Sequence, residues 1–400
     1  MMSEFDPDNF PDYSAAEPVC AKCFSDEDIG QFIEDFDGPP GCSFCGCNKN
    51  PTAPLGEVAE HMHDCLTQFF SFAVDHLPYE TREGGYQGSH WDTYDLLFDQ
   101  LGLDLPRDRD DRLRCTLPDR ISDQEWCEHN WLSLDYDQEL DYAWKKFCRT
   151  VQHERRFFFA LPKEEETEKE ERWLGDRDEF SPLGLLFEIV KLAEDFDMVQ
   201  TLPAGTKFFR GRPCKPNAPH QTAEQLGPPP WDGAVQANRM NPPGIPMMYV
   251  AETEDIAVLE TRSPCVTVGQ FQLEREARIL DLADLTDIPG IFSGAERRTR
   301  LGLVFMHAFA REIARPVDRT DRIHIEYIPS QVITEFIRDV KINDTAVDGI
   351  RYPSTFDADG RNLVLFATQD DLMEPDGTPV SKRDYPPPAP WIRLVDANLV

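Results

Sequence analysis

The stretch 238–262 reads NRMNPPGIPMMYVAETEDIAVLETR and joins a loop, a strand and a helix. Its Pro- and Gly-rich beginning predicts a loop that carries Arg239, and the apolar run after it predicts a strand. Thr253 is the expected N-cap of a helix on which Glu260 shares the apolar face with Ala257. A carboxylate on that inward face needs either a partner, such as an arginine, or a chemical task.

A second cationic position lies upstream of this stretch. Arg210 and Arg212 flank Gly211 directly after the apolar residues of an expected strand. Arginine in such a place is suited to a bidentate contact with an anion. Together with Arg239, Tyr249 and Glu260, these arginines predict a pocket for a phosphorylated substrate.

Short apolar runs surround the stretch, and amphipathic runs lie between them. Strands and helices therefore alternate irregularly from residue 181 onward, which favours an α+β domain over a doubly wound sheet. Ser330 is a second serine in this region, and we expect it to cap a helix that starts at Gln331. The expected strands cover 206–211, 245–251, 265–273, 277–285, 322–328 and 361–368, and the expected helices cover 181–196, 254–262, 296–315 and 331–341.

The chain has eleven cysteines, and five of them fall within residues 20–47. An odd number with this clustering is a poor disulfide framework and a better metal site. Two Cys-x-x-Cys knuckles separated by eighteen residues are typical of a structural zinc site with no open coordination position. The expected ligands are Cys20, Cys23, Cys42 and Cys45, with Cys47, His61 and His63 as alternatives.

Helical periodicity over residues 55–77 and 136–151 predicts a small α-helical domain between the knuckles and the α+β part. The chain is therefore expected to be multidomain, with a small zinc ribbon and an α-helical region before the α+β domain. The expected parts are an acidic lead over 1–19, zinc-binding knuckles over 20–54, a helical domain over 55–161, a charged linker over 162–180 and the α+β domain over 181–400.

The formal net charge of the chain is −34, and it is distributed unevenly. Residues 1–180 carry −25 and residues 181–400 carry −9. A polyanion repels phosphate backbones and anionic lipid, so nucleic acid and membrane surfaces are unexpected partners. No run of about 18 apolar residues is present and the N-terminus is acidic, so we expect a cytoplasmic protein.

The sequence of the C-terminal part closely resembles the RES domain, which is named for Arg, Glu and Ser residues. The resemblance spans roughly residues 205–370 and rests on FFRGR, on the stretch quoted above and on GIRYPSTFDADGRNLVLFAT. Arg239 matches the family's Gly-Arg-Phe/Met-Asn-x-x-Gly loop, although Asn238 replaces the usual Gly. The other matched positions are Arg210, Tyr249, Glu260 and Ser354.

The resemblance implies an ADP-ribosyltransferase-like fold and an activity that consumes NAD. Many relatives are the toxin of a toxin–antitoxin pair. It implies that Arg239, Glu260 and Ser354 are catalytic. It also implies that these three residues bind NAD together with Arg210 and Tyr249. Glu260 would stabilise the positive charge that develops on the ribose when nicotinamide leaves. Arg239 and Arg210 would hold the pyrophosphate or position an incoming anion.

The acceptor decides which enzyme this is, and the sequence leaves it open. Water gives NAD hydrolysis, inorganic phosphate gives phosphorolysis, and a protein side chain gives ADP-ribosylation. We favour phosphate or water, because two arginine-bearing loops can admit a small anion. The alternative to an enzyme is a non-enzymatic binding protein that zinc stabilises. An antitoxin or immunity protein and a second copy of the chain are the other expected partners.

The N-terminal half resembles the knuckle and helical segment, classed with HEPN domains, that precedes RES domains in some longer bacterial proteins. A HEPN ribonuclease needs an Arg and a His separated by four to six residues on a helix. The nearest pair, Arg149 and His153, has only three residues between. We therefore expect a regulatory or recognition module here and no ribonuclease.

Overall fold

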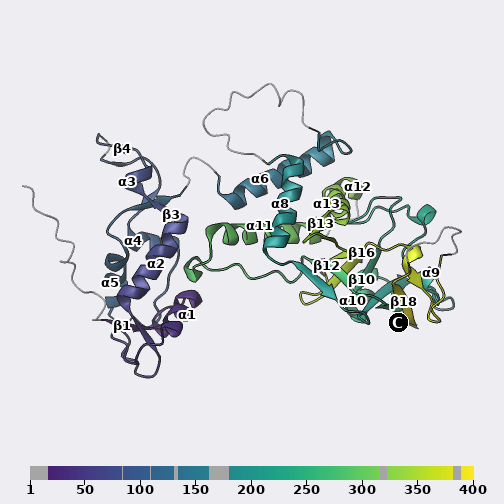
Figure 1. Cartoon of the computed structure of the whole chain (residues 1–400), viewed down its shortest axis with the longest axis horizontal. Coiled ribbons are helices and arrows are strands. Elements are labelled where there is room, and N and C mark those ends of the chain that lie inside the picture. The colour runs from purple at the N-terminus through teal and green to yellow at the C-terminus, as the bar shows by residue number, and fades with distance from the viewer. Residues whose placement is uncertain are drawn as a thin grey trace, which may run out of the picture. The chain divides into compact units, whose positions relative to one another are not determined.

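The computed structural model describes residues 17–82, 84–108, 110–129, 134–161, 180–315, 322–381 and 389–400. The predicted lead over 1–19 and the predicted linker over 162–180 lie almost wholly outside these residues. The chain forms two compact units, shown in Figure 1 and described separately below. The N-terminal unit comprises Met1–Asp135 and Ile288–Leu301, and the C-terminal unit comprises Tyr136–Asp287 and Gly302–Val400.

The N-terminal unit is mainly helical, with two short strand pairs and a short three-stranded sheet. Its helices are α1 (Glu27–Phe36), α2 (Leu55–Phe69), α3 (Ala73–His76), α4 (Thr93–Asp95) and α5 (Arg112–Ile121). Its strands are β1 (Pro18–Cys20), β2 (Thr52–Pro54), β3 (Phe70–Phe72), β4 (Tyr79–Glu80), β5 (Gly85–Tyr86), β6 (His90–Trp91) and β7 (Trp126–Glu128). The pairs are β1-β2 and β4-β5, and the three-stranded sheet has the order β3-β7-β6. A core of buried apolar residues from α1, α2 and α5 holds the unit together, and Phe292 of the later segment joins it.

The single helix predicted over 55–77 is wrong at residues 70–72, because α2 covers its first part and α3 forms a separate short helix after the break. Helix α2 ends at Phe69, and the next three residues form β3, which pairs with β7 through Ser71 and Cys127. The helix ends because pairing with a distant strand outweighs the local helical pattern, as it often does for aromatic residues. The helix predicted over 136–151 is present as α6 (Tyr136–Arg149), and it belongs to the C-terminal unit.

The C-terminal unit is built on a nine-stranded mixed sheet in the order β17-β18-β11-β9-β10-β16-β15-β12-β8. Its strands are β8 (Val199–Leu202), β9 (Lys207–Pro213), β10 (Met248–Ala251), β11 (Val266–Leu273), β12 (Ala277–Asp281), β15 (Gly349–Pro353), β16 (Arg361–Leu365), β17 (Leu372–Met373) and β18 (Ile392–Leu399). A separate small hairpin is formed by β13 (Lys341–Ile342) and β14 (Thr345–Ala346). The pairs β12–β15 and β17–β18 are parallel, whereas the other neighbours are antiparallel. This mixed sheet confirms the predicted α+β class.

The helices of this unit are labelled in Figure 1. They are α6, α8 (Pro182–Asp195), α9 (Ala223–Leu226), α10 (Glu254–Thr261), α11 (Arg297–Ala314), α12 (Ile323–Glu326) and α13 (Ile328–Asp339). Residues 297–301 at the start of α11 belong to the N-terminal unit. Strand β16 shows how the sheet is covered, because its side chains alternate between faces. Val364 packs into the core formed with α6, α8, α11 and α13, whereas Leu363 and Leu365 pack into the core on the other face.

Two expectations about the segment before α13 are wrong. Residues 322–328, predicted as a strand, contain α12 instead and have no strand partner among the described residues. Helix α13 begins at Ile328, so Ser330 lies in its first turn and Tyr327 is the N-cap. Pro329 suits that first turn because its missing N–H would have no helical partner there. Ser330 therefore has no capping role, and its hydroxyl donates to backbone carbonyls.

The sheet splits between β9 and β10. These neighbours share one residue pair, Ala251 with Phe209, whereas β9 pairs with β11 along seven residues. Beyond Phe209, the edge of β9 therefore diverges from β10, and backbone groups on both edges lack their usual ladder partners. The two strands diverge at Arg210 and Arg212, which were predicted from sequence to bind an anion.

No described helix is both long enough and apolar enough to cross a membrane.

Candidate functional site

The four predicted metal ligands come together in the N-terminal unit. Sγ of Cys20 lies 4.0 Å from that of Cys23 and 3.6 Å from that of Cys45, and Cys23 and Cys42 are 3.6 Å apart. A tetrahedral zinc site with Zn–S bonds of about 2.3 Å needs sulfur separations of about 3.8 Å. Burial raises the pKa of the Cys20 thiol to about 11, so a cation in the cluster is needed to keep this sulfur as a thiolate.

The predicted alternative ligands lie outside this cluster. All four ligand sulfurs lie within 4.8 Å of one another, and the cluster includes neither Cys47 nor a histidine. The backbone carbonyl of Cys47 accepts from the N–H of Cys42, which shapes the second knuckle. His61 stacks on Phe32 and contacts the carbonyl of Phe292. The described residues therefore favour a four-cysteine site that could hold zinc.

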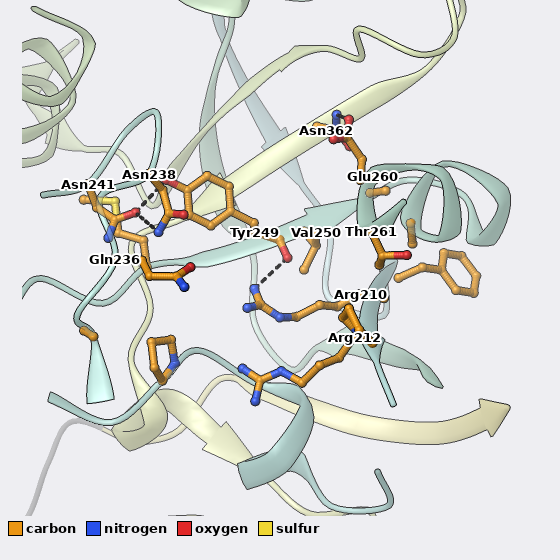
Figure 2. Close-up of a pocket in the computed structure, with 18 of the residues that line it drawn as sticks. Arg210, Arg212, Gln236, Asn238, Asn241, Tyr249, Val250, Glu260, Thr261 and Asn362 are labelled. Atoms are coloured by element: carbon orange, nitrogen blue, oxygen red, sulfur yellow. Dashed lines mark hydrogen bonds between the residues drawn. The ribbon is translucent and has the colours of Figure 1, made fainter. Parts of the chain in front are cut away.

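The C-terminal unit has a pocket of about 700 Å³ at the split in its sheet. Figure 2 shows Arg210 and Arg212 extending from β9 on one side, with Glu260 and Asn362 on the other. Tyr249 of β10 and the loop that carries Asn238 and Asn241 form a further wall. The volume lies within the range of about 300–1,000 Å³ that is usual for small-molecule and cofactor sites.

The split between the strands is bridged by a side chain. Nη1 of Arg210 donates to the backbone carbonyl of Tyr249 over 2.8 Å, so it satisfies a group that a continuous ladder would have paired (Figure 2). Burial lowers the pKa of Arg210 to about 10, which still leaves the guanidinium charged at neutral pH. Its Nε is buried without a hydrogen-bond partner among the described residues. A polar group on a bound ligand would supply that partner.

Arg212 provides a second cation on the same side of β9, because side chains two residues apart in a strand share a face. Its Nη2 donates to the carbonyl of Gly227 over 3.1 Å, and burial lowers its pKa. Gly211 between the two arginines allows α10 to approach. A Cβ at this position would lie 2.3 Å from the carbonyl oxygen of Ala257 and 2.7 Å from the side chain of Thr261.

Hydrogen bonds from Tyr249 and from α13 hold the loop that carries Arg239. The hydroxyl of Tyr249 donates to Oδ1 of Asn241 over 2.6 Å, and Nδ2 of Asn241 donates to the carbonyl of Ile245 over 2.7 Å. From α13, Gln331 donates to the carbonyl of Asn238, and Ser330 donates to that of Arg239. Burial raises the pKa of Tyr249, so its hydroxyl remains a donor.

Arg239 borders the pocket but does not line it. Its guanidinium carbon lies 5.6 Å from the centre of the Tyr352 ring, and Tyr352 itself lines the pocket. The guanidinium forms no ion pair with any residue that the structure describes. A stacked and unpaired cation beside a pocket is available to an anionic ligand.

Glu260 lies in the last turn of α10 and is exposed at the pocket, contrary to the inward position predicted from its helical face. Its carboxylate is nevertheless held in place. Nδ2 of Asn362 donates to Oε1 over 2.7 Å, and the hydroxyl of Ser354 donates to the same oxygen over 3.2 Å. The salt bridge to an arginine considered from sequence does not occur among the described residues. Oε1 is thus fixed by two donors.

Asn362 is the residue that the sequence analysis missed. It is 4 % exposed and directly precedes the apolar residues 363–365 of β16. A buried amide in an apolar strand needs a partner, which was the available signal. The expected site residues Arg210, Tyr249 and Glu260 line one pocket, and Arg239 and Ser354 contact that pocket through Tyr352 and Glu260.

The fold and its sites define an α+β multidomain protein with a four-cysteine cluster in a helical N-terminal unit and a polar pocket in a C-terminal sheet. Two family models match this chain. Residues 37–165 match HEPN/RES N-terminal domain 1, and residues 217–387 match the RES domain. The chain therefore consists of a HEPN/RES N-terminal domain followed by a RES domain, and RES domains form a family of NAD-degrading toxins.

These matches confirm the resemblance identified from the sequence. The RES match starts after β9, so Arg210 and Arg212 lie outside it although both line the pocket. No curated protein and no solved structure matched the chain.

The four-cysteine cluster predicts about one zinc ion per chain. Cys42→Ser should lower the zinc content to below about half of that and melt the N-terminal unit at a lower temperature, because metal binding supplies folding free energy. Cys47→Ser is the matched control and should keep the metal. Metal analysis and thermal unfolding measure both effects, and loss of zinc in Cys47→Ser would instead identify Cys47 as a ligand.

Proposed function

We propose that this chain cleaves the bond between nicotinamide and ribose in NAD, with inorganic phosphate or water as the acceptor. The RES family supplies the substrate class. The observation that carries the proposal is the pocket at the split sheet. It has cationic groups on one wall and a carboxylate held by Asn362 and Ser354 on another.

The cationic wall suits the pyrophosphate of NAD. Two phosphates carry two negative charges, and Arg210 and Arg212 offer guanidinium groups that favour phosphate oxygens. The buried Nε of Arg210 gains a partner when a phosphate oxygen occupies the pocket. Arg239 offers a further charge near Tyr352, where it can hold a phosphate of NAD or an incoming inorganic phosphate.

The carboxylate wall suits the reacting sugar. When nicotinamide leaves, positive charge develops on the ribose, and a carboxylate fixed beforehand stabilises that charge with little reorganisation. Asn362 and Ser354 bind Oε1 of Glu260, so Oε2 remains available for the ribose or its hydroxyls. Ser354 does not line the pocket, so it acts on the reaction through its hydrogen bond to Glu260.

The test is to incubate the purified full chain with NAD, with and without phosphate, and to identify products by mass spectrometry. We expect nicotinamide together with ADP-ribose 1″-phosphate when phosphate is present, and ADP-ribose when it is absent. ADP-ribose attached to a protein would favour a transferase, and unchanged NAD would favour a non-enzymatic binding protein. Either of these results would overturn the proposal.

Glu260→Gln should lower kcat/KM for NAD by about 100-fold or more, because it removes the charge that stabilises the transition state while keeping the size of the side chain. Glu254→Gln is the matched control, since Glu254 is exposed in the first turn of the same helix and lies outside the pocket. Release of nicotinamide measures both. Full activity of Glu260→Gln would remove Glu260 from the mechanism.

Asn362→Asp should move the acid limb of the pH–rate profile to higher pH. A second carboxylate beside Glu260 disfavours its ionised form and so raises its pKa, and activity is then lost at a higher pH as the solution is acidified. Asn398→Asp, at an exposed position on β18, should leave the profile unchanged. An unshifted profile in a folded Asn362→Asp protein would show that Asn362 does not position the catalytic carboxylate.

A further inference from the structure

Cys214 and Cys265 face each other across two neighbouring strands. The antiparallel register of β9 and β11 pairs Pro213 with Val266, and one step further it places Cys214 opposite Cys265. The N–H of Cys214 donates to the carbonyl of Cys265 over 3.1 Å. The two Sγ atoms are 3.3 Å apart, which is shorter than the sulfur separations quoted for the four-cysteine cluster. Both side chains are half-buried, so solvent oxidants can reach them.

We propose that Cys214 and Cys265 are a thiol modification site, and that a peroxide oxidises them to a disulfide that clamps the wall of the pocket. The sulfur of Cys214 attacks the peroxide and becomes a sulfenic acid, and one water leaves. The sulfur of Cys265 then attacks that sulfenic sulfur, forms the S–S bond and releases a second water. Two thiol hydrogens are thus removed and hydrogen peroxide is reduced to two molecules of water.

The two thiols are within hydrogen-bond distance of each other, and either sulfur can be the donor. The pKa of Cys265 is raised, first by its hydrogen bond with Cys214 and then by burial. A thiol that keeps its proton is a poorer nucleophile, so Cys265 is disfavoured as the first sulfur to attack the peroxide. Ser263 fixes the backbone here, because its hydroxyl donates to the carbonyl of Cys265 over 3.0 Å.

A metal site does not account for the pair. Among the residues that the structure describes, three or more Cys, His, Asp or Glu ligand atoms gather only in the four-cysteine cluster. His220 is close in the chain, but its ring contacts the carbonyl of Pro213. Two sulfurs without further ligands are better suited to bond to each other than to hold an ion.

The bridge would close a ring over residues 214–265, which includes Arg239, Tyr249 and Glu260. A cross-link lowers the conformational entropy of the unfolded chain, so the folded unit gains stability. The sulfurs need to approach by only about 1.3 Å to reach the S–S bond length of about 2.05 Å. Strand β9 and the pocket wall therefore keep their arrangement when the bridge forms.

The test treats the reduced full chain with hydrogen peroxide, digests it and maps disulfides by mass spectrometry. We expect a linked peptide that joins Cys214 to Cys265 and is two hydrogens lighter than its reduced parts. The melting temperature of the C-terminal unit should rise by about 5 °C and return when dithiothreitol is added. Cys214→Ser and Cys265→Ser should each lose the linked peptide and the rise in melting temperature.

Cys115→Ser is the matched control, because Cys115 is an exposed cysteine of the N-terminal unit. This variant should keep the linked peptide and the thermal shift. Two results would overturn the proposal: oxidation of Cys115 without a linked Cys214–Cys265 peptide, or an equal thermal shift in Cys214→Ser. Neither readout depends on NAD, so the outcome is independent of the proposed function.

Discussion

The separation of β9 from β10 is the constraint on which the pocket depends. The two strands pair at one position and then diverge, which opens the sheet beside Arg210 and Arg212. The cost of unpaired backbone groups is reduced where Arg210 donates to the carbonyl of Tyr249. The guanidinium of Arg210 thus stabilises the opening in the sheet and places a positive charge in it. The fold and the site therefore depend on the same side chain.

The opposite wall depends on how closely α10 lies against β9. Only glycine fits at position 211, because any side chain would meet the carbonyl of Ala257. That close approach places the last turn of α10 at the pocket, where Glu260 reaches Asn362 of β16 and Ser354 after β15. Residues separated by about 100 positions in the chain therefore meet at one carboxylate oxygen. Their meeting is a consequence of sheet order and helix packing, not of any local sequence pattern.

Local chemistry was predictable from the sequence, whereas long-range geometry was not. The Cys-x-x-Cys knuckles and the cap at Thr253 follow from spacing within a few residues, and the structure has both. The exposure of Glu260 could not be predicted from helical spacing, because α10 is short and its last turn borders a pocket that other strands form. The end of α2 at Phe69 likewise depends on pairing between β3 and the distant strand β7.

The net charge of −34 gives little guidance to the chemistry of the pocket. Most of the acidity belongs to residues 1–180, whereas the pocket is built from residues after 200 and contains two arginines. Charges in water are screened beyond about 10 Å at moderate salt, so guanidinium groups that contact a ligand outweigh any carboxylate that lies farther from that ligand than this. A partly buried arginine acts in a lower effective dielectric, where its attraction for phosphate is stronger. An acidic chain can therefore bind an anionic substrate, provided that the local wall is cationic and shielded from water.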